Sequence, residues 1–201
     1  MATIEQSVKS QVARVFTVGD WRLFKKFAEL NLRDAARLLT RDISIENSLK
    51  LLARNSRKRL LIGVGVELLL KAVYLKHGYL INRPPQGSAL TFPYKAEDAL
   101  DTQLVTDKTC MLSQLIENLP EIVSLKSEAT TIRGLKIAKV FRNKEGHCVT
   151  RAHQFDASNY VDIASSLSTV YRDAFGERLL IKFSVAPREV AKWRVSRLTD
   201  A

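Results

Sequence analysis

Arg142, Asn143 and His147 are the three side chains whose types and spacing best suit chemistry on a phosphodiester. Cleavage of RNA requires that the 2′-hydroxyl lose a proton and that the leaving 5′-oxygen gain one. Histidine, with an ordinary pKa of about 6.5, can do either near neutral pH. Arginine stays charged and can bind the phosphoryl oxygens as negative charge builds. Asn143 can hold a phosphate or the imidazole, and this chemistry needs no metal or other cofactor.

The segment that carries these residues has the pattern of a helix end. On a helical projection, its apolar side consists of Ile137, Val140 and Phe141. Its polar side consists of Lys136, Lys139, Arg142 and Asn143. If Gly146 takes a left-handed conformation just past the helix, Arg142 lies three residues inside the end and His147 two outside. A Schellman hydrogen bond then brings the two side chains together. A cation that interacts with the helix dipole, beside a solvated histidine, is the alternative interpretation.

Other polar residues near this segment are weaker candidates. Five of them are candidates for binding RNA, namely Lys136, Lys139, Lys144, Arg151 and His153. For Arg151 and His153 a solvated loop is the competing interpretation. The histidines and cysteines match no usual zinc-finger spacing, so no metal site is predicted. The basic run over 54–59 fits a phosphate-binding surface as well as a solvated helix face.

Composition limits the class of protein and its partners. The chain has 201 residues, 46% hydrophobic and 26% charged, with a formal net charge of +11. We expect one domain, 1–201, with a core over about 20–176 and a basic extension over 177–201. Two distant cysteines exclude a disulfide framework. The excess of Lys and Arg, at both ends of the chain, predicts a polyanionic partner, of which nucleic acid and anionic lipid are the commonest.

Nothing in the apolar pattern predicts a membrane partner. The longest apolar run, 60–75, contains Glu67 and Lys71 and is too short to span a bilayer. No signal peptide is apparent at the N-terminus. We therefore expect a cytoplasmic protein. Gly63 and Gly65 in this run make a strand the competing assignment, but its length favours a helix, and no phosphate-binding loop surrounds them.

Helical periodicity dominates the chain and predicts an all-α fold. The expected helices cover about 4–15, 20–40, 44–77, 108–118, 119–144, 158–175 and 187–198. In the second of them, Trp21, Phe24, Phe27 and Leu30 are expected to face the core. A long connection follows the central helix and allows one short hairpin near 90–94. Residues 178–186 alternate weakly and are expected to be extended.

The motif and its position resemble those of the HEPN family. Arg142-Asn143-x-x-x-His147 resembles the family's Arg-x4–6-His motif, in which a polar residue usually follows the arginine, and Gly-Val-Glu67-Leu-Leu-Leu-Lys71-Ala is similar to its second core helix. The order of helices also agrees, so the likeness covers roughly 20–176. It implies an up-down bundle of four or five helices, usually homodimeric, in which both protomers' motifs meet in one cleft.

The resemblance implies a metal-independent endoribonuclease of a toxin–antitoxin, phage-defence or CRISPR system, with Arg142, Asn143 and His147 as catalytic residues. Its partners would be RNA, a second copy and an antitoxin or regulatory protein. Glu67 would orient Arg142, or else it pairs with Lys71. Val149 stands where some toxins paired with nucleotidyltransferases carry tyrosine. The alternatives are a catalytically silent HEPN module that binds nucleotide, RNA or protein, and a structural helical adaptor.

Overall fold

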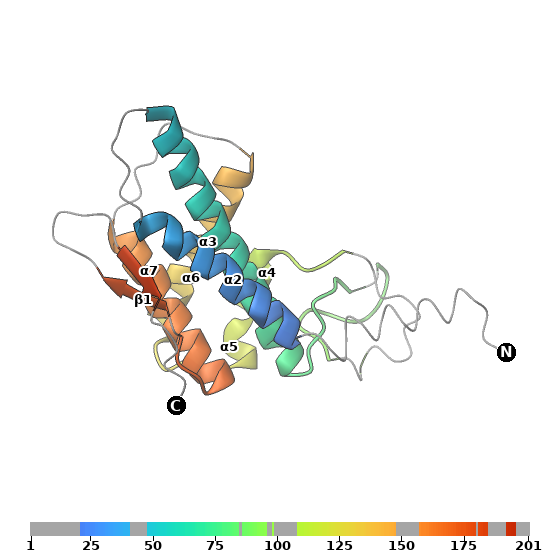
Figure 1. Cartoon of the computed structure of the whole chain (residues 1–201). Coiled ribbons are helices and arrows are strands. Elements are labelled where there is room, and N and C mark those ends of the chain that lie inside the picture. Colours follow the sequence, from blue (N-terminus) through green and yellow to red (C-terminus); the bar gives the residue numbers. More distant parts are fainter. Residues whose placement is uncertain are drawn as a thin grey trace.

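The computed structural model describes residues 21–40, 48–84, 86–95, 98, 108–147, 157–179, 181–184 and 192–195. It is an all-α bundle (Figure 1), as predicted. Its elements are α2 (Trp21–Thr40), α3 (Ser48–Lys76), α4 (Leu112–Glu117), α5 (Leu119–Ile122), α6 (Glu128–His147), α7 (Ala157–Val170), η3 (Tyr171–Phe175), β1 (Ile181–Ser184) and β2 (Lys192–Val195). The helix predicted over 4–15 lies outside the described residues. No helix among the described residues is long and apolar enough to cross a membrane.

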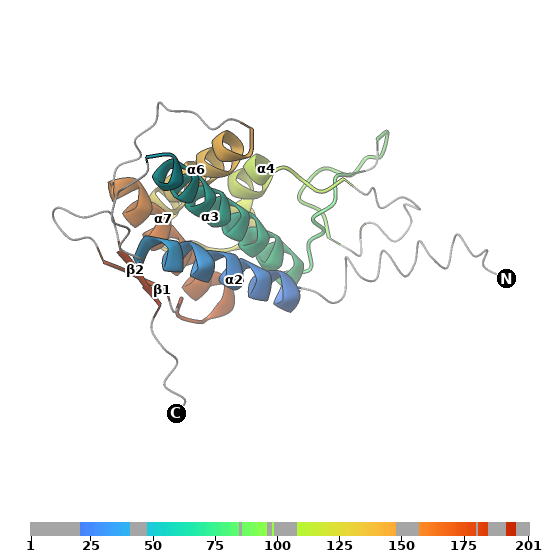
Figure 2. The ribbon, with the colours of Figure 1, turned by 45° about the horizontal axis from the view of Figure 1, so that its top comes forward.

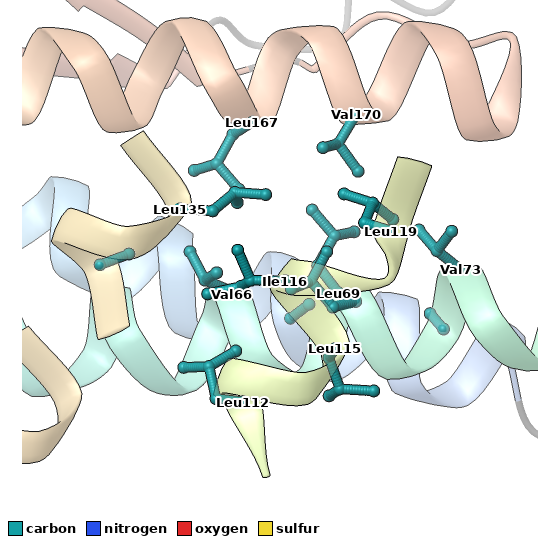
Figure 3. Packing of buried hydrophobic residues seen from close by; sticks show 14 of the residues in the cluster. Val66, Leu69, Val73, Leu112, Leu115, Ile116, Leu119, Leu135, Leu167 and Val170 are labelled. Atoms are coloured by element: carbon teal, nitrogen blue, oxygen red, sulfur yellow. The ribbon is translucent and has the colours of Figure 1, made fainter. Parts of the chain in front are cut away.

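The long helix α3 lies at the centre of the bundle, with α2 and α6 beside it (Figure 2). Its apolar second half is buried, as the sequence predicts. Figure 3 shows this core, in which α3 residues meet side chains from α4, α6 and α7. The labelled side chains are Val66, Leu69, Val73, Leu112, Leu115, Ile116, Leu119, Leu135, Leu167 and Val170. Helix α3 therefore provides the surface on which the other helices are positioned.

Helix α2 packs on α3 mainly through alanines and Leu32, and only some of its larger apolar residues contact the core. Ala28, Leu32 and Ala35 are fully buried against the core. The predicted core positions Trp21 and Phe24 do pack against it. Phe27 and Leu30 do not: with exposed fractions of 49% and 42% they face outward, as Leu23 also does. The short alanine side chains let the helices approach closely, and this turns the larger residues outward.

The connection after α3 begins at Gly78, whose φ of +82° is a left-handed conformation that suits glycine. Isolated antiparallel bridges then join Tyr79 to Lys95 and Asn82 to Thr109. The hairpin that the sequence allows near 90–94 is not formed by these described residues. Instead, the connection folds back along itself, and Thr109 is thereby brought near the end of α3.

The single helix predicted over 119–144 is wrong, because α5 and α6 are separate. Val123 is extended, with φ −136° and ψ 127°, and its side chain is 5% exposed. The backbone N–H of Lys126 donates to Asp173 Oδ2 at 3.0 Å, which fixes the break against η3. The sequence Asn118-Leu-Pro-Glu121 has the pattern of a capping box, but Asn118 makes no side-chain cap, and its Nδ2 donates to the Gln114 carbonyl at 2.9 Å.

The C-terminal part confirms one prediction and corrects another. Helix α7 and the π-helical turn η3 end at Gly176, with φ +71°, as the sequence predicts. β1 confirms the extended segment. The helix predicted over 187–198 is wrong where the structure describes it, because Lys192–Val195 forms β2, antiparallel to β1. Phe183 and Trp193 are register partners, and such β-favouring pairs stabilise a hairpin more than a helix.

Candidate active site

The candidate site forms where α6 crosses α3. A Cβ added to Gly63 would lie only 2.6 Å from Arg142 Cβ and 2.7 Å from the Arg142 backbone nitrogen. Ordinary contacts are longer than this, so only glycine permits the crossing. The backbone and Cβ of Arg142 therefore lie directly against α3, and the rest of its side chain extends beside the next turn of that helix.

Glu67 lies on that next turn, four residues after Gly63 and on the same face of α3. Its Oε2 accepts a charge-assisted hydrogen bond from Arg142 Nε, and its Oε1 lies 2.9 Å from Lys71 Nζ. Lys71 Nζ also lies 3.3 Å from Thr109 Oγ1. Both sequence interpretations of Glu67 thus describe a real contact. Glu67 pairs with Arg142 on α6 and with Lys71 one turn further along α3.

The ion pair between Glu67 and Arg142 is buried on the Glu67 side and open to solvent on the Arg142 side. The side chains of Glu67 and Lys71 are 12% and 11% exposed, whereas that of Arg142 is 40% exposed. Ion pairs are screened less when buried, so the carboxylate holds the guanidinium firmly. Arg142 is anchored through Nε, and its Nη1 lies 3.4 Å from Asn143 Oδ1. A guanidinium held in this way can bind an anionic group on its exposed side.

The expected geometry at Gly146 is wrong. Helix α6 continues through Gly146 to His147, so the glycine lies within the helix and not past its end. The preceding Lys144 and Glu145 are strong helix formers, and propagation through them replaces the predicted Schellman turn. On a continuous helix, positions five residues apart are rotated by about 140°. Positions 142 and 147 are therefore not neighbours around α6; the His147 side chain itself lies outside the described residues.

The polar side of α6 agrees in part with the prediction. Lys136, Asn143 and Lys144 are exposed, and Lys139 is half-buried. Arg151 and His153, the other two RNA-binding candidates, lie outside the described residues. The candidate cations that are described therefore flank Arg142 along a single helix.

The apolar side of α6 is rotated from its predicted position. Phe141 is buried as expected, but Leu135 and Ala138 complete the core face, and Val140 is 38% exposed. Ile137 is only partly buried. These outward residues border a shallow groove of about 380 Å³, lined by Ala129, Ile132, Arg133, Lys136, Ile137 and Val140. An apolar strip thus runs along α6 beside the cations.

The basic run over 54–59 is divided between structural and exposed positions. Arg54 Nε donates to the Leu38 carbonyl at 2.7 Å and so satisfies a carbonyl in the last turn of α2. Lys58 is 3% exposed, and its Nζ lies 4.9 Å from the centre of the Tyr160 ring. Burial, with smaller contributions from Arg59 and Arg54, lowers the pKa of Lys58 to about 8. The run is therefore not a continuous phosphate-binding face.

Sequence reasoning missed Gly63, Thr109 and the burial of Lys58. A detectable signal did exist for the first: glycine within an apolar helix indicates close approach of another backbone. Thr109 and Lys58 had no comparable signal, because both depend on tertiary contacts. The part of the chain that the structure describes contains no group of three or more His, Cys, Asp or Glu side chains that can hold a metal ion.

Comparison with protein-family models, curated proteins and solved structures finds no match to this chain.

Proposed function

We propose that the chain is a metal-independent endoribonuclease of HEPN type that acts as a homodimer, in a toxin or phage-defence system. The observation that carries the proposal is the anchoring of Arg142, the arginine of the Arg-x4-His motif, by a buried acid on the central helix. An exposed but oriented guanidinium is what stabilisation of a pentacoordinate phosphorane requires. The net charge of +11 adds attraction for RNA.

The proposed reaction uses only groups of the chain and of its substrate. The 2′-hydroxyl attacks the adjacent phosphorus as a neutral His147 imidazole accepts its proton. The P–O5′ bond breaks, and a protonated His147 imidazole of the second copy gives its proton to the leaving oxygen. Arg142 binds the non-bridging oxygens while their charge increases. The products are a 2′,3′-cyclic phosphate and a 5′-hydroxyl, so no water is consumed in this step.

The proposed homodimer brings the motif helices of two copies together. Positions 142 and 147 are separated by about 140° around one helix, and in the proposal a twofold partner completes a site of one arginine and two histidines around one phosphate. The strip with the half-buried Ile132 and Ile137 and the exposed Val140 offers an apolar face for such a contact. Arg133, at its edge, is partly neutralised by Asp162, whose Oδ2 lies 3.0 Å from Nη2.

A catalytically silent module that binds nucleotide, RNA or a protein is the second candidate. The same ion pair favours it: Glu67 already gives Arg142 a carboxylate partner, and a purely structural arginine needs nothing more. In a silent module that binds nucleotide or RNA, the exposed side of the guanidinium would hold a phosphate without cleaving it.

Incubation of the purified chain with total RNA in EDTA distinguishes the two candidates. The ribonuclease proposal expects cleavage that EDTA does not affect, products that end in 2′,3′-cyclic phosphate, and loss of cleavage in His147→Ala. His77→Ala is the matched control, because His77 is exposed and follows the distant end of α3. Cleavage by His147→Ala at the parent rate contradicts the proposal. Binding of RNA without cleavage by the parent favours the silent module.

A further inference from the structure

The outer face of α2 carries an apolar ridge that the fold does not bury. Leu23, Phe27 and Leu30 follow one another at spacings of four and three residues, with exposed fractions of 46%, 49% and 42%. This spacing places them in one row along two turns of the helix. Such a row on a surface helix is typical of a site that receives another helix.

The contacts of α2 within the fold, with α3, β2 and β1, leave these three side chains about half exposed. The opposite face of α2 is already packed against α3 through Ala28, Leu32 and Ala35, all fully buried. Gly65 of α3 sits so close to Leu32 that an added Cβ would lie 2.8 Å from Leu32 Cγ. The ridge is therefore additional to a complete intramolecular contact, and not a weak part of the core.

Cations border the ridge on one side. At about 100° per residue, four basic residues form an adjacent row along the helix, namely Arg22, Lys26, Arg33 and Arg37. Arg22, Lys26 and Arg37 are exposed, and Arg33 is half-exposed. Asp34 is the single acid on the outward side; its Oδ1 lies 3.3 Å from Arg37 Nη1. The face thus combines an apolar row with a strongly basic edge.

We propose that this face of α2 binds an acidic amphipathic helix of a partner protein. The partner's apolar row packs on Leu23, Phe27 and Leu30, and its flanking carboxylates meet the basic edge. Charge complementarity of this kind determines which partner binds and accelerates its association. Phe27 is the central anchor, since a large aromatic side chain in the middle of a row contributes most to such contacts. The proposal does not depend on RNA cleavage.

The same features disfavour the other occupants. A second copy of the chain would bring two identical basic edges together in a twofold contact, where like charges repel. In a membrane the short ridge would carry Asp34 into the apolar layer, which is costly. RNA would use the cations but would leave Leu23 and Leu30 against a polar backbone.

The test uses the full chain and a labelled helical peptide of about three heptads, with leucine at the core positions and glutamate at the flanking ones. A twin peptide has lysine in place of glutamate. Fluorescence anisotropy should show binding of the acidic peptide only, weakening several-fold as salt rises from 50 to 300 mM, because screening reduces the charge attraction. Phe27→Ser with Leu30→Ser should weaken this binding by about tenfold or more.

A charge-reversal variant makes the test specific. Arg22→Glu with Lys26→Glu should lose the acidic peptide and gain the basic twin; acids in the first two turns of α2 also agree with the helix dipole. Val161→Ser on α7 is the matched control, since Val161 is likewise an exposed apolar residue and lies outside both proposed contacts. Equal binding of both peptides by the parent chain, or binding unchanged by Phe27→Ser with Leu30→Ser, would overturn the proposal. So would α2-dependent binding of anionic vesicles or oligouridylate in place of the acidic peptide.

Discussion

Substitution of Gly63 by alanine should separate Arg142 from Glu67 while leaving both residues in the sequence. The new Cβ would lie 2.6 Å from Arg142 Cβ and 2.7 Å from its backbone nitrogen. Because ordinary contact begins at 3.4 Å, α6 must retreat from α3 by about 0.8 Å at this crossing. The obstruction is the Arg142 backbone and Cβ, and no change of rotamer can relieve it. The Nε–Oε2 bond must therefore lengthen or bend.

The cost in stability should be small and the cost in function large. Overpacking costs about 1–3 kcal/mol, and alanine regains about 1 kcal/mol over glycine in a helix interior. The net loss in the free energy of unfolding is then about 0–2 kcal/mol. A displacement of about 1 Å at a catalytic group reduces the rate by about 10²-fold. We therefore expect a folded Gly63→Ala variant whose RNA cleavage falls by about two orders of magnitude.

Gly65→Ala is the matched control. Its added Cβ also clashes, but mainly with the flexible end of Leu32 on α2, away from Arg142. Urea unfolding measures stability for both variants, a single-turnover cleavage assay measures the rate, and the NMR shift of Arg142 Nε–H reports the ion pair directly. An unchanged Nε–H signal in Gly63→Ala would refute the crossing geometry. Equal loss of cleavage in both variants would show that stability, and not the position of Arg142, controls the rate.

Three further perturbations test other parts of the structure. His147→Ala should lower the cleavage rate by about 10²–10⁴ and Arg142→Ala by about 10²–10³, and in single-turnover assays the double variant should be little slower than the slower single one. Val140→Glu should convert the dimer to a monomer by light scattering at micromolar concentration, because a charge replaces apolar contact at the twofold face; a wild-type monomer would contradict the composite site. Burial lowers the pKa of Lys58 from 10.5 to about 8. Between these two pH values the unfolded chain therefore binds more protons than the folded one. The free energy of unfolding should rise with pH over this range, by up to about 3 kcal/mol. Urea titrations at pH 7 and pH 10.5 should lose this rise in Lys58→Met; an equal rise in both proteins would contradict the burial of a charged lysine.

The helical periodicity of apolar residues predicted the main helices, because this periodicity reflects which face of each helix is buried. The length of the apolar run over 60–75 favoured a central helix over a strand, and Gly78 and Gly176 ended α3 and the last turn of the bundle where their left-handed conformations are needed. The contact between Glu67 and Arg142 came from resemblance to a family, since no spacing in one sequence relates residues 75 positions apart. The ion pair itself is visible only in the structure.

The errors share a tertiary cause. Helical propensity continued across Val123, but the hydrogen bond from Lys126 to Asp173 favours a turn there. Apolar residues at Phe27 and Leu30 suggested a core face, yet the alanines opposite them allow the closer approach to α3. At Gly146 a local rule for helix ends gave way to continued helix. In each case a local preference of a fraction of a kcal/mol was outweighed by packing or propagation.

The two glycines of α3 have a joint mechanical consequence. Gly63 receives α6 and Gly65 receives α2; since they are two residues apart, they face nearly opposite directions and differ by only about 3 Å in height. At this height α3 therefore receives the Arg142 backbone of α6 on one side and the Leu32 side chain of α2 on the other, with the three helices lying side by side (Figure 2). A displacement of α2 at this level is transmitted through Leu32 and the α3 backbone to the turn of α6 that carries Arg142.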